Sequence, residues 1–235
     1  MASRPGILLQ ARMASTRLPG KALEFIEDRP LLEHCLRRLV AAGVARVVLA
    51  TTVLEEDTVL CDLATRLGVA VYRGSASDVL ARMAKAAEAF DLNPVIRATG
   101  DNPAVDIDAP QRALAAMREL HVDYVCEDGL PLGAAVEAVT RDALLRSDRE
   151  AHAPDDREHV TTWVKRRSDL WNLAFPAPPA PLRRPDLRVT VDTPADLAYV
   201  RSLYARAGTG QPSLRALIEA AEPLDAARGK QKEVA

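Results

Sequence analysis

Short apolar runs of β-type alternate with amphipathic segments through the first half of the chain. In the longer segments apolar side chains recur every three or four residues, which predicts helices with one buried face. Strands that alternate with helices of about ten to fifteen residues predict an α/β fold with a mostly parallel, doubly wound sheet. The predicted strands are "ILLQ" (7–10), "RVVLATT" (46–52), "VAVYRG" (69–74), "PVIRAT" (94–99) and "DYVCE" (123–127), and the predicted helices cover 30–43, 55–68, 77–90 and a segment opened by Asp108 and Pro110.

Residues that favour helix ends stand at the boundaries of these segments. Gly43 and Gly68 follow two of the predicted helices and predict C-terminal caps. Ser77 predicts the N-terminal cap of a third helix. Thr193, followed by Pro194 at the first helical position, predicts the start of a later one.

The alternation changes after about residue 127. The segment "GLPLGAAVEAVT" (129–140) alternates only weakly, so it predicts a hairpin insertion near residues 127–140, or an arm, rather than another strand and helix. We expect this segment to form either a wall of the substrate site or a contact between subunits. Five prolines within 175–185 predict an extended connection.

The last part of the chain predicts a strand and two helices. The strand covers 187–191, the helix after Thr193 ends near Gly208, and a short helix covers 213–222. Residues 223–235 are too polar to pack, so we expect a disordered tail. Residues 1–222 are then expected to form a single domain, because a chain of 235 residues is not too long for one.

A basic, hydroxyl-rich loop follows the first predicted strand. It carries Arg12, Arg17 and Lys21, and its spacing allows the three cations to surround one polyanion such as a triphosphate. Gly20 allows close approach of the backbone. The loop is neither a Walker A motif nor a dinucleotide fingerprint. Three solvated loop cations would be an equally good explanation, since Arg and Lys are mostly exposed.

Two aspartates lie where they could share an edge of the sheet with this loop. Asp101 follows Gly100 at the end of the fourth predicted strand, and Asp192 ends the late strand. Ligands bind at the carboxyl ends of such strands, and carboxylates there can hold Mg²⁺ against phosphates. Spacing alone favours Asp192 as a helix-entry residue beside the Thr193 cap.

Composition excludes several classes of protein. The chain has 31 Lys and Arg against 33 Asp and Glu, so neither a nucleic-acid partner nor a membrane surface is indicated. Three widely spaced cysteines, Cys35, Cys61 and Cys126, predict buried thiols in a reducing compartment, and the first apolar run is too short for a signal peptide. We therefore expect a cytoplasmic protein.

The histidines give little support for covalent catalysis. Only His159 has charged and aromatic neighbours along the chain, and a surface role explains it as well as a substrate contact does. No Ser-His-Asp or Cys-His arrangement can be assigned.

Five motifs in order carry a resemblance to a known family. The chain reads "QARMASTRLPGKAL", "TGDNP", "PLGAAVE", "REHVT" and "TVDTPADL". Together these resemble the cytidylyltransferases that activate acidic sugars, typified by the CMP-KDO and CMP-sialate synthetases, and especially their spore coat polysaccharide branch. The likeness spans residues 6–222. It implies a Rossmann-like nucleotidyltransferase sheet of the nucleotide-diphospho-sugar transferase type.

The resemblance also implies roles for individual residues. Arg12 and Lys21 would stabilise charge in the transition state, and Asp101 and Asp192 would bind Mg²⁺. Arg97, Glu137 and His159 would lie where the acceptor binds. The implied nucleotide-binding residues are Leu9, Gln10, Ala11, Arg12, Ser15, Arg17, Lys21, Ala50, Thr51, Arg73, Asp78, Arg82 and Gly100.

The resemblance implies a reaction as well. A hydroxyl of an acidic sugar or related acid would attack the α-phosphate of CTP, pyrophosphate would leave, and catalysis would rest on positioning and electrostatics. Relatives of this kind are commonly homodimers built partly through the hairpin. Thr52 and the small residues of "PLGAAVEAV" depart from the family pattern and leave the acceptor open. A glycosyltransferase that uses a nucleotide sugar, or a non-catalytic nucleotide-binding subunit, are the alternatives.

Overall fold

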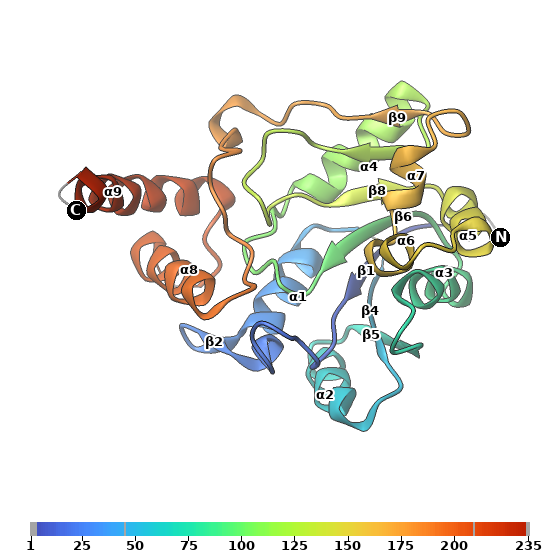
Figure 1. Ribbon diagram of the computed structural model, residues 1–235, viewed down its shortest axis with the longest axis horizontal. Helices are drawn as coiled ribbons and strands as arrows, with labels where there is room; N and C mark the ends of the chain where they lie inside the picture. The colour runs from blue at the N-terminus through green and yellow to red at the C-terminus, as the bar shows by residue number, and fades with distance from the viewer. Residues whose placement is uncertain (1–3, 45, 209, 234–235) are drawn as a thin grey trace.

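A seven-stranded sheet forms the centre of the computed structural model, which describes the backbone at residues 4–44, 46–208 and 210–233 and side chains as far as residue 224 (Figure 1). The strand order is β5-β4-β1-β6-β8-β7-β9. The first four strands of this order are parallel, which confirms the predicted α/β class and the mostly parallel sheet. The strands of the sheet are β1 (Arg4–Gln10), β4 (Val47–Thr52), β5 (Ala70–Gly74), β6 (Leu92–Thr99), β7 (Tyr124–Cys126), β8 (Glu137–Val139) and β9 (Leu173–Ala174).

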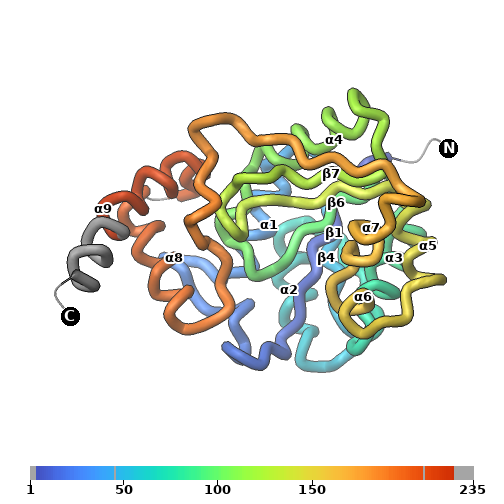
Figure 2. The backbone as a smooth tube through the Cα atoms, turned by 45° about the horizontal axis from the view of Figure 1, so that its top comes forward, coloured from blue at the N-terminus to red at the C-terminus, as the bar shows by residue number. Residues whose placement is uncertain are grey.

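Helices cover both faces of the sheet, because successive side chains of a strand point to opposite sides. On β1, Ile7 and Leu9 pack into one hydrophobic cluster with α1, α2, α4, α8 and α9, whereas Leu8 packs into a second cluster with α3, α5 and α7. Both views show α8 and α9 together at one end of the molecule (Figure 2). The helices are α1 (Leu31–Ala41), α2 (Thr58–Arg66), α3 (Val79–Ala89), α4 (Ala109–Leu120), α5 (Arg141–Glu150), α6 (Pro154–His159), α7 (Thr162–Arg166), α8 (Pro194–Ala207) and α9 (Leu214–Glu233).

Short elements complete the chain. The small hairpin β2 (Phe25–Ile26) and β3 (Arg29–Pro30) stands apart from the main sheet. The 3-10 helices η1 (Lys21–Leu23), η2 (Glu55–Asp57) and η3 (Ala180–Leu182) lie in connections. Within the described residues, no helix combines the length and the apolar character that a membrane crossing needs.

The predicted hairpin lies inside the sheet rather than beside it. β8 pairs antiparallel with both β6 and β7, so Glu137 stands opposite Arg97 on one side and Cys126 on the other. The weak alternation of this segment has a physical reason, because both of its neighbours are strands and its side chains are buried on both faces. The arm considered from the sequence is therefore wrong, and the hairpin extends the sheet that positions the site.

Most helix-end predictions hold. Gly43 and Gly68 adopt φ values of +69° and +70° after their helices, as predicted. The Thr193 side chain accepts a hydrogen bond from the Asp196 amide in a capping box, with Pro194 in the first turn. Asp108 takes the N-cap position of α4, although its side chain makes no capping bond.

Four details differ from the sequence predictions. The N-cap of α3 is Asp78 and not Ser77, since the carboxylate accepts from the Ala81 amide at 2.9 Å. Residues 187–191 are extended but form only an isolated bridge, between Leu132 and Arg188, in place of a strand. The last helix continues past Pro223 to Glu233, where a disordered tail was expected; residues 234–235 lie outside the described residues. All three cysteines are free as expected, but only Cys35 is fully buried.

Gly133 holds the predicted hairpin against the segment that carries Asp192. Its φ is +101°, and an added Cβ would lie 2.5 Å from the backbone nitrogen of Thr190. We expect Gly133→Ala to lower the free energy of unfolding by about 3 kcal/mol, because the substitution adds left-handed strain to a clash with backbone. Gly68→Ala is the matched control: its φ is +70° with nothing within 4 Å of the Cβ, so strain alone costs about 1 kcal/mol. Urea titration measures both, and equal losses would contradict the clash.

Candidate active site

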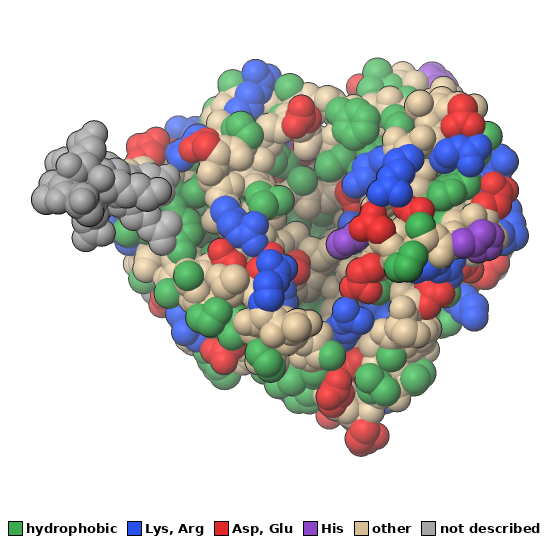
Figure 3. Space-filling model, in the orientation of Figure 1, with side chains coloured by type: hydrophobic (Ala, Val, Ile, Leu, Met, Phe, Trp, Pro, Cys, Tyr) green, Lys and Arg blue, Asp and Glu red, His purple; other side chains and the backbone are tan. Residues whose placement is uncertain are grey.

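An open cavity of about 420 Å³ lies where the carboxyl ends of β1 and β6 meet. We call residues 11–21, which connect β1 to η1, the basic loop. This loop forms one wall of the cavity, and residues of α3, α6 and the segment before α8 form the others. The space-filling view shows the hollow with side chains of both charges around its rim (Figure 3). Its place at the carboxyl edge of parallel strands is where α/β sheets bind ligands.

Local backbone bonds give the basic loop its shape. The Gly20 amide donates to the Met13 carbonyl at 3.3 Å, and the Lys21 amide donates to the Leu18 carbonyl at 3.2 Å. Gly20 has a φ of +71° at the start of η1, a conformation that glycine adopts without strain. The loop therefore turns back on itself and delivers Lys21 to the sheet edge.

Lys21 joins the two aspartates that the sequence singled out. Its ammonium group donates to Asp101 Oδ2 at 3.1 Å and to Asp192 Oδ1 at 3.1 Å. A third bond, of 2.8 Å, goes to the Val191 carbonyl. The two carboxylates converge because the Val191 amide donates to the Asp101 carbonyl at 2.9 Å. The expected meeting of Lys21, Asp101 and Asp192 at one edge is thus found, although the late segment is not a ladder strand.

Asp192 lies among three cations. Arg17 is 3.0 Å from one of its oxygens and Arg188 is 2.6 Å from the other. Partial burial works to raise the pKa of the Asp192 carboxyl, but Lys21, Arg17 and Arg188 outweigh it and hold that pKa below its ordinary value. The side chain is therefore ionised and able to act as an oxygen ligand at neutral pH.

Gly100 allows the close approach of the two strand ends. A Cβ at this position would lie 2.7 Å from the Ala11 Cβ and 3.1 Å from the Gln10 carbonyl oxygen. Its amide donates to that same carbonyl at 2.8 Å. Gly100 lines the cavity, as the predicted nucleotide-binding role requires, and it also sets the distance between Asp101 and the basic loop.

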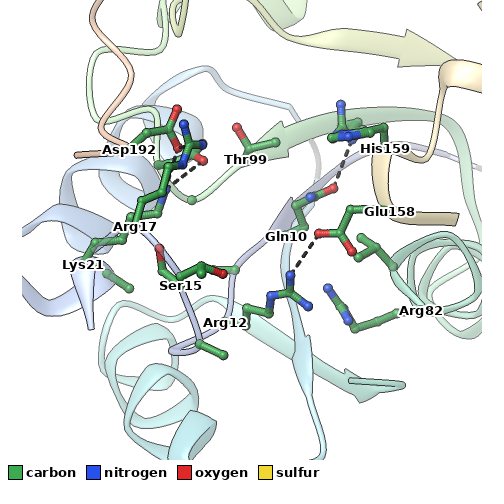
Figure 4. A pocket seen from close by; sticks show the side chains of 18 residues that line it. Gln10, Arg12, Ser15, Arg17, Lys21, Arg82, Thr99, Glu158, His159 and Asp192 are labelled. Carbon is green, nitrogen blue, oxygen red and sulfur yellow. Dashed lines mark hydrogen bonds and ion pairs between the residues drawn. The ribbon is translucent and has the colours of Figure 1, made fainter. Parts of the chain in front are cut away.

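Arg12 and Arg82 form a second charged group, across the cavity from Asp192 (Figure 4). Arg12 donates to Glu158 Oε1 at 3.0 Å and to the Ala76 carbonyl at 3.2 Å. Arg82 is buried, and its Nε has no hydrogen-bond partner among the residues that the structure describes. Burial, and then the charge of Arg12, lower the pKa of Arg82, while nearby carboxylates raise it. Two guanidinium groups side by side at a cavity wall are suited to an anionic ligand.

Glu137 holds Arg97 rather than facing the cavity. It pairs with Arg97 and accepts from the Tyr124 hydroxyl at 2.5 Å, from the Thr161 hydroxyl at 2.9 Å and from Lys165 at 3.1 Å. Burial works to raise the pKa of the Glu137 carboxyl, but Arg97, Lys165 and Tyr124 overcome it and lower that pKa to about 2.

Arg97 and His159 line the cavity on the side of α6. Arg97 is oriented from its other side by Gln10, whose Oε1 accepts from Nε at 3.0 Å. His159 is exposed, with Nε2 3.4 Å from an Asp155 oxygen. The resemblance assigned Arg97, Glu137 and His159 to the acceptor. Of these, Arg97 and His159 line the cavity and lie on the same side of it.

We expect Glu137→Gln to destabilise the fold by on the order of 3 kcal/mol at pH 7, because it leaves Arg97 and Lys165 without their buried counter-charge. The stabilisation by the carboxylate is present above its ordinary pKa of 4.5 and is lost as the pH falls toward the folded pKa of about 2. The difference in the free energy of unfolding between wild type and variant should therefore shrink over that range.

Denaturant titrations at several pH values measure this difference. The control is Glu150→Gln, in an exposed pair with Arg146, which is expected to change stability by less than about 0.5 kcal/mol. A difference that is independent of pH would contradict the assignment.

The structure brings together most of the residues predicted for the site. Of these, the cavity is lined by Gln10, Ala11, Arg12, Ser15, Arg17, Lys21, Arg82, Arg97, Gly100, Asp101, His159 and Asp192.

The other predicted residues are not among those that line the cavity. The side chains of Leu9, Ala50 and Thr51 are buried in strands. Arg73 donates to the carbonyls of Thr52 and Leu54 at 3.0 and 2.7 Å. Asp78 caps α3 and forms an ion pair with Arg157, and Glu137 holds Arg97.

Six lining residues were not predicted, namely Ala14, Thr16, Ala22, Val79, Thr99 and Glu158. Glu158 pairs with Arg12 and Thr99 ends β6. Glu158 directly precedes His159 in the "REHVT" motif, which was the only signal that could have found it. Its partner Arg12 lies 146 residues earlier in the chain, so spacing gives no indication of the contact.

The two carboxylates fit a hard divalent cation. Among the described residues, no group of three or more His, Cys, Asp or Glu side chains could hold a metal. Asp101 and Asp192 nevertheless converge on a single cationic atom, the Lys21 nitrogen. Mg²⁺ is usually held by one or two carboxylates and completes its shell with water and substrate phosphates. This donor set therefore suits an ion that arrives with a phosphate ligand.

Known proteins resemble this chain both in sequence and in fold. A sequence profile described as "Cytidylyltransferase" matches residues 7–223. The spore coat polysaccharide biosynthesis protein SpsF of Bacillus subtilis is 34% identical over 207 residues, which are 86% of this chain and 86% of that protein. The structure of a cytidylyltransferase from Leptospira borgpetersenii has a TM-score of 0.85 at 28% identity, over 96% of each chain.

A more distant structure shares the fold alone. It is the CMP:2-keto-3-deoxy-manno-octonic acid synthetase complexed with CTP, with a TM-score of 0.65 at 20% identity over 86% of this chain and 99% of that one. The family profile spans nearly all of the described residues and includes every charged residue of the cavity. The chain therefore belongs to the cytidylyltransferase family of nucleotidyltransferase enzymes.

Proposed function

We propose that this protein transfers CMP from CTP to a hydroxyl of a sugar acid or related acid and releases pyrophosphate. One observation carries the proposal: Lys21, Asp101 and Asp192 meet at one end of a cavity whose walls carry Arg12, Arg17 and Arg82. The other support is the likeness to a spore coat polysaccharide protein and to a synthetase complexed with CTP.

The triphosphate lies along the basic loop in this proposal. Arg12 and Lys21 neutralise charge on the transferring phosphate, while Ser15 and Arg17 bind the departing pyrophosphate. Gln10 and Ala11, at the end of β1, face the base and ribose, with the backbone at the end of β4 beside them. Arg82 contacts the nucleotide from α3. These residues orient the substrate, and no protein nucleophile takes part.

Asp101 and Asp192 would hold the divalent cation, which we propose to be Mg²⁺. When bound, the ion would supply positive charge that neutralises the phosphates. The hydroxyl oxygen forms the new bond to phosphorus, the bond to the bridging oxygen of pyrophosphate breaks, and the hydroxyl proton passes to solvent.

The acceptor lies between β6 and α6. Arg97 and His159 face the cavity there, and Glu137 positions Arg97 without touching the acceptor. Arg97 supplies the positive charge that an acidic acceptor requires.

The test is pyrophosphate release from CTP, Mg²⁺ and a panel of sugar acids, repeated with ATP, GTP and UTP. We expect release only with CTP and an acid acceptor. Turnover of a CMP-sugar or UDP-sugar without pyrophosphate would indicate a glycosyltransferase instead. CTP binding measured by calorimetry without product for any acceptor would indicate a non-catalytic subunit.

We further propose that the protein acts in the cytoplasm as a homodimer with residues 1–222 as one domain. Leu132, in the predicted hairpin, and Phe175, directly after β9, are exposed apolar side chains that a second copy could cover. Light scattering after gel filtration tests this, and a monomeric mass would contradict it.

A further inference from the structure

A buried carboxylate lies beneath the basic loop, outside the cavity. Asp57, the last residue of η2, is fully buried. Its Oδ1 accepts a hydrogen bond from the Met13 amide at 2.6 Å, and its Oδ2 accepts from the Thr52 hydroxyl. Thr52 in turn accepts from the Leu54 amide at 3.1 Å. One side chain thus ties the loop after β1 to the loop after β4.

Asp57 does not form the capping hydrogen bond that its position before α2 predicts. It occupies the N-cap of α2, where an aspartate usually accepts from the amide of the second or third helical residue. Its side chain makes no such bond. The carboxylate instead reaches an amide 44 residues earlier in the chain. A buried carboxylate is costly unless hydrogen bonds compensate it, and here the Met13 amide and the Thr52 hydroxyl supply them.

Met13 is the point at which the basic loop is held from both sides. Asp57 fixes its amide, and the Gly20 amide fixes its carbonyl at 3.3 Å. Arg12 directly precedes Met13 and Ser15 follows it closely, and both of these line the cavity. The orientation of Met13 therefore sets the direction in which the two phosphate-binding candidates leave the loop.

The charge of Asp57 also reaches the opposite cavity wall. It raises the pKa of Arg82, against the lowering by burial and by Arg12. Asp57 thus acts on Arg82 without lining the cavity itself.

We infer that Asp57 is a positioning residue that sets the conformation of the basic loop and, through it, the affinity for the triphosphate of the nucleotide. The inference rests on the proposed function for the identity of the ligand. It assigns Asp57 no contact with substrate. A purely structural role in η2 and α2 would instead affect all ligands and the stability alike.

The test compares the binding of CTP and CMP to Asp57→Ala by calorimetry. Losing a hydrogen bond to a charged acceptor should weaken CTP binding by about 10- to 100-fold, while CMP, which lacks the β- and γ-phosphates, should change less than about 3-fold. Asp57→Asn keeps an acceptor for the Met13 amide and should restore most of the CTP affinity. Asp62→Ala, an exposed position on α2, is the matched control and should bind both nucleotides as wild type does.

Equal losses for CTP and CMP, or an unchanged CTP affinity in Asp57→Ala, would overturn the inference. If that variant does not fold, Asp57→Leu, which fills the buried volume without offering an acceptor to the Met13 amide, takes its place: tryptic cleavage at Arg17 that is faster than in wild type and in Asp57→Asn supports the role, and an equal rate overturns it. Failure of the proposed function and failure of the role of Asp57 give different results. A wild-type protein that binds CTP no better than CMP contradicts the proposed function, whereas loop cleavage still tests Asp57.

Discussion

Replacing Lys21 by methionine is expected to lower the rate of pyrophosphate release about 10³-fold, since it removes from a largely buried site the donor that we propose for the reacting phosphate. The Lys21 ammonium is 3.1 Å from each of Asp101 and Asp192. Methionine preserves the length of the side chain but leaves these two carboxylates without the cation between them. The affinity of the free protein for Mn²⁺ should therefore be equal to or higher than that of wild type, even though activity is lost.

The measurement combines steady-state kinetics with titration of Mn²⁺ followed by electron paramagnetic resonance. Lys85→Met is the control, because Lys85 is exposed on α3 and lies outside the cavity. A Lys21→Met protein with more than a tenth of wild-type activity would remove Lys21 from the proposed machinery. A strong loss of Mn²⁺ affinity would contradict its place between the carboxylates.

The second large effect is expected for Asp101→Asn. This change keeps the shape of the side chain but removes one of the two charged oxygen ligands proposed for the divalent cation, and we expect about a 10³-fold loss of kcat/KM at ordinary Mg²⁺ concentrations. Part of the activity should return as Mg²⁺ is raised, because the weaker site then fills.

Asp108→Asn is the matched control for this variant. Asp108 lies in the same segment, is exposed and makes no capping bond, so its activity and its Mg²⁺ dependence should equal those of wild type. An Asp101→Asn enzyme whose Mg²⁺ dependence is unchanged would argue that Asp101 positions Lys21 rather than a metal.

The parallel half of the sheet could be predicted because its signals are local. The apolar run of β1 and the helix between it and β4 each show their period within a dozen residues or so, and the glycines at 43 and 68 mark helix ends by their own conformational freedom. The antiparallel pairing of β8 with β6 could not be predicted in this way. It joins Val95 to Val139 and Arg97 to Glu137, and such distant pairing has no local pattern.

The late segment shows how backbone hydrogen bonds can replace a predicted strand. Its apolar alternation suggested pairing in the sheet, yet Val189 and Thr190 donate to the Leu132 carbonyl, and Val191 donates to the Asp101 carbonyl. These bonds satisfy the backbone outside a regular ladder. They also place Asp192 beside Asp101. The sequence predicted this proximity too, but from a sheet strand over residues 187–191.

The sequence by itself determined the alternating strands and helices of the first half of the chain, the basic loop, the two candidate carboxylates and, through five motifs, the family. Only the tertiary structure decided which charges meet: Lys21 with both aspartates, Arg12 with Glu158, and Asp57 with the Met13 amide. The physical reason is that periodicity and capping act over a few residues, whereas the partner of a charged side chain is chosen by packing between segments distant in the chain.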